Sequence, residues 1–123
     1  MPVKPLNTSS LTPLLVRLDT LRGAEICSIT TRSPTSLSII FSVQDSARGF
    51  DWIDIKFIVS GVRDAKLVSD TILRSLDMSE GITVELSRNS CALAIGEYKG
   101  HVDEAPLYII GASMQYEELP FSG

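Results

Sequence analysis

The fold is decided by the stretch Trp52-Ile53-Asp54-Ile55-Lys56-Phe57-Ile58-Val59-Ser60-Gly61. Successive side chains of a strand point to opposite faces, so the odd-numbered residues from Ile53 to Val59 share one entirely apolar face. The other face carries Asp54, Lys56 and Ser60 and is partly polar. This alternation predicts a long strand with one face in a core and the other partly open to water.

The same period of two recurs along most of the chain and predicts further strands. The expected strands cover Glu25–Thr31, Ser36–Gln44, residues 51–60, Arg63–Val68, Ile82–Arg88, Cys91–Lys99 and Leu107–Glu117. Short turns join most of them, which favours antiparallel neighbours. We therefore expect a β-rich α+β fold, an antiparallel meander of six or seven strands that forms a sandwich or half-barrel, with one or two short helices.

Two short helices are expected outside these strands. Thr12-Pro13 is typical of a helix start, and Gly23 is a suitable end for the leucine-rich segment that follows it. A second helix is expected from Ser69 to about Met78. Its inward-facing side chains would be Ile72, Leu73 and Leu76.

The length of 123 residues indicates one domain. Residues 1–10 contain two prolines and a polar cluster, so we expect a flexible N-terminal lead-in there and a single globular domain over 11–123. The alternation also identifies a core. Its expected members are Leu37, Ile39, Phe41, Ile55, Phe57, Val84 and Leu86.

Composition and charge bound the cellular setting. The formal net charge of −4 argues against nucleic acid or an anionic membrane as the main partner, because both attract basic surfaces. The sequence contains neither a secretory signal nor an apolar run long enough to span a bilayer, so a cytoplasmic location is expected. Cys27 and Cys91 lie inside apolar strand patterns, which are typical of buried, reduced thiols. Spacing alone does not decide whether they form a disulfide.

The sequence contains no signature of a specific chemistry. His101 is the only histidine, and it lies in a polar loop with Asp103 and Glu104. Zinc takes three or four ligands in fixed geometry, and the loop has no second histidine or cysteine pair to complete a metal site. Phosphate-binding, dinucleotide-binding and hydrolase motifs are missing from the sequence. We therefore favour a non-enzymatic protein with no cofactor and no metal.

Candidate binding residues lie on two strands. Trp52 and Asp54 are two residues apart and so share a strand face, while Tyr116, Glu117 and Glu118 lie near the end of the last strand. Trp52 would either seal the edge of the core or anchor a partner, since tryptophan is common at binding hot spots. The acidic residues would suit a basic protein surface.

Three segments together resemble a known group of proteins. They are Ala-x-Ile-x-Ser-Ile from Ala24, Trp-Ile-x-Ile-x-Phe-x-Val-x-Gly-Val from Trp52, and Tyr-Ile-Ile-Gly-Ala-Ser from Tyr108. Over residues 22–116 the chain resembles small bacterial immunity-like proteins of polymorphic toxin systems and related uncharacterised domains. The resemblance implies stoichiometric, toxin-neutralising protein binding and carries no catalytic residues.

Two other functions remain open at this point. A small-ligand-binding protein or minor enzyme would place its pocket in the concave face of the sheet, near Tyr98, His101 and Tyr108. A homo-oligomeric structural subunit would instead pair through an exposed edge strand.

Overall fold

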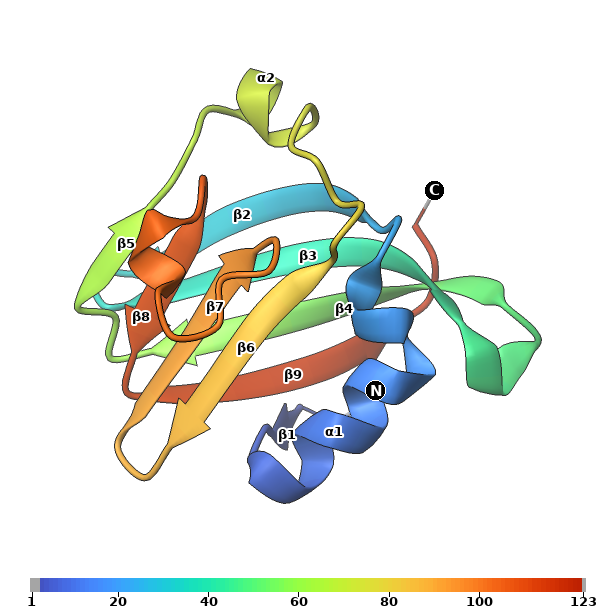
Figure 1. The fold of residues 1–123 in the computed structure, drawn as a ribbon, viewed down its shortest axis with the longest axis horizontal. Helices are drawn as coiled ribbons and strands as arrows, with labels where there is room; N and C mark the ends of the chain where they lie inside the picture. The colour runs from blue at the N-terminus through green and yellow to red at the C-terminus, as the bar shows by residue number, and fades with distance from the viewer. Residues whose placement is uncertain (1–2, 123) are drawn as a thin grey trace.

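Two antiparallel sheets pack face to face in the computed structural model, which describes residues 3–122 (Figure 1). The first sheet has the order β1-β9-β4-β3-β2 and the second the order β5-β8-β7-β6. The strands of the first sheet are β1 (Lys4–Pro5), β2 (Glu25–Ser33), β3 (Ser36–Asp45), β4 (Asp51–Ser60) and β9 (Ser113–Leu119). Those of the second are β5 (Asp64–Lys66), β6 (Ile82–Ser87), β7 (Ser90–Ile95) and β8 (Tyr108–Gly111).

The helical elements are short and lie between the strands. They are α1 (Thr8–Arg17), η1 (Asp19–Leu21), η2 (Ser46–Arg48), α2 (Asp70–Leu73) and η3 (Val102–Glu104). None of the helices within residues 3–122 is long and apolar enough to cross a membrane. The expected β-rich, antiparallel α+β class is confirmed, in its sandwich form rather than as a half-barrel.

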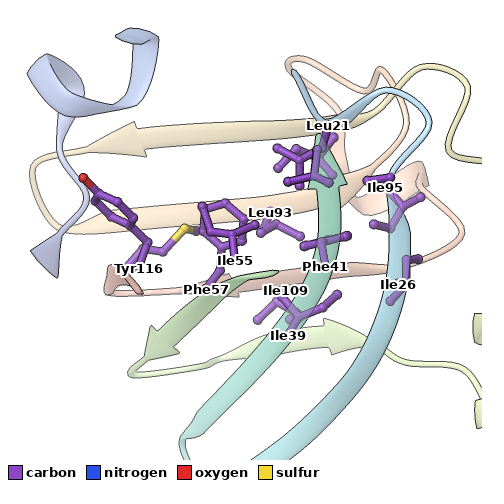
Figure 2. Packing of buried hydrophobic residues seen from close by; sticks show 14 of the residues in the cluster. Leu21, Ile26, Ile39, Phe41, Ile55, Phe57, Leu93, Ile95, Ile109 and Tyr116 are labelled. Carbon is purple, nitrogen blue, oxygen red and sulfur yellow. The ribbon is translucent and has the colours of Figure 1, made fainter. Parts of the chain in front are cut away.

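The core lies between the two sheets and has the composition that the alternation predicts. Ile39, Phe41, Ile55 and Phe57 are fully enclosed, and the rings of Phe41 and Phe57 meet edge to face with centroids 6.0 Å apart. Leu93, Ile95 and Ile109 face them from the second sheet (Figure 2). Of the expected core residues, Val84 and Leu86 are only half-buried and pack against its margin.

The last predicted strand is split between the two sheets. Leu107–Glu117 was expected to be continuous, but the chain bends at Ala112, so β8 belongs to the second sheet and β9 to the first. The bend is tight, because a Cβ at Gly111 would lie 2.6 Å from Val59 Cγ1 and 2.9 Å from the Ser60 carbonyl oxygen. On either side of the bend, Tyr108 lies outside the main core, whereas Tyr116 is buried in it.

The N-terminal segment contains more secondary structure than the sequence predicts. In place of the expected lead-in, residues 4–5 pair with β9, Leu6 is buried, and α1 begins at Thr8 rather than at Thr12-Pro13. Asn7 caps the helix, its Oδ1 accepting hydrogen bonds from the amides of Ser9 and Ser10 at 3.0 Å. Residues 1 and 2 of the expected lead-in lie outside the described residues.

The second predicted helix is shorter than expected. Ser69 caps α2 as predicted, but the helix ends at Leu73 instead of about Met78. Leu73 is buried, whereas Ile72, predicted to face inward, has 51% of its surface exposed. The remaining chain from 74 to 81 runs as turns towards β6 (Figure 1).

Candidate functional site

Exposed aromatic side chains gather where β4 begins and the C-terminal segment passes. Trp52, on the outer face of β4, is 37% exposed, and its ring lies against that of Phe121 with centroids 5.8 Å apart and planes at 31°. Phe121 is itself 45% exposed. Trp52 therefore packs on another residue of the surface.

Phe50 adds a third exposed ring, two residues before Trp52. It is 62% exposed and has a backbone φ of +67°, a left-handed conformation that is an outlier for a bulky residue. Its amide donates to the Asp45 carbonyl at 2.9 Å, and its own carbonyl accepts from Gln44 Nε2 at 3.2 Å. We call Phe50, Trp52 and Phe121 the aromatic corner.

Sequence reasoning found only one member of the aromatic corner. Phe50 follows Gly49 in a polar turn, and Phe121 follows Pro120 beyond the last predicted strand. A large aromatic residue inside a polar turn was the signal that could have identified Phe50, because such a position offers little burial. The only local feature of Phe121 is its place after Pro120, and this feature does not predict its contact with Trp52.

Asp54 shares the outer face with Trp52, as predicted, but it does not present a charge to solvent. Only 3% of its surface is exposed, and Oδ1 accepts a hydrogen bond of 2.6 Å from Ser42 Oγ on the neighbouring strand. The Ser42 hydroxyl is also 3.0 Å from Cys27 Sγ. Asp54 is therefore linked through Ser42 to β3 and β2, and its carboxylate is not available at the surface for contact with a partner.

The predicted group on β9 is divided between two faces. Tyr116 is paired with Phe57 in the register of β4 and β9 and is only 9% exposed, so it belongs to the core. Glu117 lies opposite Lys56 on the outer face, with its Oε1 3.5 Å from Lys56 Nζ. Glu117 is therefore the β9 residue of this group that shares a face with Trp52.

Glu118 belongs to an ion cluster that fixes α1 beside the aromatic corner. It forms an ion pair with Arg17, whose Nε also lies 3.0 Å from Oδ1 of the enclosed Asp45. Arg48 approaches the other Asp45 oxygen at 3.5 Å, and Ser46 Oγ donates to the Arg17 carbonyl at 2.7 Å. The cluster joins the C-terminus of α1 to the β3–β4 connection and to β9.

The surroundings of the aromatic corner are acidic on balance. With the enclosed Asp54 left out, four carboxylates stand against three basic side chains there: Asp45, Asp51, Glu117 and Glu118 against Arg17, Arg48 and Lys56. Asp51 is exposed and takes part in no ion pair among residues 3–122. A surface of this kind attracts cationic groups.

The alternative pocket residues lie together, but not on the concave side of a sheet. Tyr98 and Tyr108 pack on a small alanine-rich cluster on the outer face of the second sheet, away from the main core. The Tyr98 and His101 rings meet edge to face at 5.8 Å, and His101 is 4.0 Å from Glu104. The Tyr108 hydroxyl donates to Asp64 at 3.1 Å, a bond that raises the pKa of Tyr108.

Tyr98, His101 and Tyr108 lie outside two hollows of the surface and outside any metal-binding group in the part of the chain that is described. None of the three lines the hollow beside β2 or the hollow near the start of α1. That part of the chain also contains no group of three or more histidine, cysteine, aspartate or glutamate side chains arranged to hold a metal ion.

The two cysteines are free and differ in exposure. Cys91 is buried as expected, but Cys27 is exposed, because it lies at an irregularity of the edge strand β2. Alkylation by iodoacetamide at mildly alkaline pH is expected to be fast at Cys27 and slow at Cys91. Burial raises the pKa of the Cys91 thiol, and the thiolate is the reactive form.

Mass spectrometry of the folded protein over time would measure both alkylation rates. A Cys27→Ser variant serves as the control and should show only the slow reaction. Equal rates at the two positions in the folded protein would contradict the assignment of Cys27 to the surface.

No protein-family model, curated protein or solved structure matches this chain.

Proposed function

We propose that this chain is a non-enzymatic binding protein that engages a basic protein surface through the aromatic corner. Stoichiometric binding of this kind is what the resemblance to immunity-like proteins of toxin systems implies. The observation that carries the proposal is the contact between the exposed rings of Trp52 and Phe121 on a locally acidic surface, with the exposed Phe50, in a left-handed backbone conformation, two residues before Trp52.

The conformation of Phe50 supports a role beyond folding. A left-handed backbone costs roughly 1–2 kcal/mol for a residue with a Cβ, and a ring that is 62% exposed recovers little of this by burial. For folding alone, glycine would be the better residue at this position. Strain of this kind is retained most often at sites that bind or react.

The chemistry of the aromatic corner is that of an interface centre. Aromatic side chains are enriched in protein interfaces, and tryptophan is frequent among the few residues that dominate binding energy. The surrounding carboxylates would steer a basic partner and raise the rate of association at low salt. The aromatic rings, buried on binding, would instead slow dissociation.

Truncation of the aromatic corner is expected to weaken binding without unfolding the protein. Trp52→Ala should raise the dissociation constant for the partner by roughly 30-fold or more, which corresponds to a hot spot of about 2 kcal/mol. Phe50→Gly should also weaken binding, while the free energy of unfolding stays the same or rises. Ile72→Ala is the matched control, because Ile72 is similarly exposed but lies on α2.

The measurement is affinity capture from the native host with wild type and variants, followed by binding kinetics at two salt concentrations. Trp52 is the only tryptophan of the chain, so the tryptophan fluorescence of the protein reports directly on the aromatic corner. Supporting results are a partner lost with Phe50→Gly and Trp52→Ala but kept with Ile72→Ala, and association that slows as salt rises. The proposal would be refuted if wild type and all variants captured the same partner equally, or if the protein bound a small metabolite tightly and no protein partner was recovered.

A further inference from the structure

The free edge of β2 is the least protected strand edge of the described chain. Within residues 3–122, Glu25–Ser33 make no backbone hydrogen bond to any element other than β3. Nine residues of extended backbone therefore expose donors and acceptors along one side, and such a row is a template for another strand.

The other three sheet edges are shorter than β2 and are blunted or covered, whereas on β2 only the Glu25 end has a helix, α2, beside it. β1 has two residues, one of them proline, and β5 has three residues and ends in a lysine. β6 lies against η1. β2 contains neither proline nor lysine, and its pairing with β3 is regular from Ser28 to Thr31, between two irregularities.

We infer that β2 pairs antiparallel with β2 of a second copy of this chain and so joins the two five-stranded sheets into one. In a pairing centred on Ile29, the Ile29 residues of the two copies lie opposite each other on the core side. The core-side face of one β2 strand then continues into the core-side face of the other. Ser28 then lies opposite Thr30 on the outer side. This interface is distinct from the aromatic corner and does not depend on the proposed function.

Charge complementarity selects a second copy, in this orientation, as the occupant. β2 carries Glu25 near one end and Arg32 near the other, both exposed and neither in an ion pair within residues 3–122. Antiparallel pairing about Ile29 sets Arg32 of one copy opposite Ile26 of the other, next to its Glu25. The two-fold symmetry of the dimer creates this contact between opposite charges twice. A parallel arrangement would place like charges together, which is unfavourable.

The surroundings of β2 leave room for the added strand. A hollow of about 800 Å³ separates residues 23–27 from residues 73–79. The extended chain of the second copy, from residue 31 to 33, would pass through this hollow. The pairing therefore fills an open space beside the glutamate end of β2.

Charge reversal tests the inference through the self-association of the whole chain, measured by analytical ultracentrifugation over a range of concentrations. Glu25→Arg and Arg32→Glu should each raise the dimer dissociation constant by roughly ten-fold or more, since two attractions become repulsions. An equimolar mixture of the two variants should dimerise again, because each copy then supplies the complement of the other. The double variant E25R/R32E should also recover.

Matched controls separate this interface from a general effect of net charge. Glu97→Arg and Lys99→Glu make the same two changes of charge on an exposed loop of the second sheet and should leave the dimer unchanged. Circular dichroism confirms that each variant is folded. A wild-type chain that stays monomeric, a dimer insensitive to both reversals, or a mixture that does not re-associate would each overturn the inference.

Discussion

Replacing Phe57 with alanine is expected to lower the free energy of unfolding by about 3–5 kcal/mol, the cost of emptying a large buried aromatic site. Phe57 has no exposed surface, and its ring meets that of Phe41 across the centre of the first sheet. The cavity would lie between two sheets that are both fixed by strand pairing, so the surrounding backbone could relax only partly. Chemical denaturation followed by circular dichroism would give the free energy.

Phe121→Ala is the matched control for this experiment. It removes the same side chain from a position that is 45% exposed, so it should cost less than about 1 kcal/mol. A Phe57→Ala loss as small as that of the control would show that β4 presents its other face to the core.

The sequence alone placed the core strands correctly because their pattern is local. Ser36–Asp45 and Asp51–Ser60 alternate with few exceptions, such as Ile40 and Ile58, and the apolar residues of the dry face, from Leu37 to Val59, are buried. The short connections between neighbouring strands carry enough information to predict antiparallel pairing. Fold class follows from these two local signals.

Which of the two sheets a strand joins depends on contacts between distant parts of the chain. The local sequence pattern was therefore insufficient to predict it. Residues 107–112 are an uninterrupted run of apolar side chains and glycine, so hydrophobic alternation gives no sign of the bend at Gly111 and Ala112. The N-terminus of α1 was misplaced for a different reason. The polar run from Asn7 to Ser10 is typical of a loop, but here it forms a capping box.

The candidate site was predicted in part for the same reasons. Trp52 and Glu117 share the outer face, as alternation and register allow. Asp54 was expected at the surface because it is acidic, but neighbouring strands enclose it, and burial by neighbours depends on strand order. Phe121 reaches Trp52 only because β9 pairs with β4, a contact between residues far apart in the sequence.

Gly81→Ala is expected to be the other strongly destabilising substitution, with a loss of about 2–5 kcal/mol. Gly81 has a φ of +72°, and a Cβ there would overlap the Thr20 carbonyl oxygen and lie 2.9 Å from the Thr20 carbonyl carbon. The left-handed backbone costs roughly 1–2 kcal/mol for alanine, and forcing an extra carbon into a packed site adds about 1–3 kcal/mol.

The backbone around Gly81 has little freedom to move away from the added carbon. Its amide donates to the Met78 carbonyl at 3.0 Å, and its carbonyl accepts from the Gly96 amide at 2.8 Å. On the other side of the contact, Thr20 is the middle of three consecutive residues with left-handed φ values of 52°, 56° and 62°. A shift on either side would break a hydrogen bond or disturb an already strained turn.

Gly23→Ala separates the two contributions to this loss. Gly23 has nearly the same φ, +74°, but a Cβ there would meet no atom within 4 Å, so only the cost of the left-handed backbone should appear, about 1–2 kcal/mol. The difference between the two variants in thermal or denaturant unfolding then measures the clash with Thr20. If both variants lost the same free energy, the turn at Asp19–Leu21 would have to be mobile enough to retreat, and the close contact between it and the start of β6 would not hold the fold together.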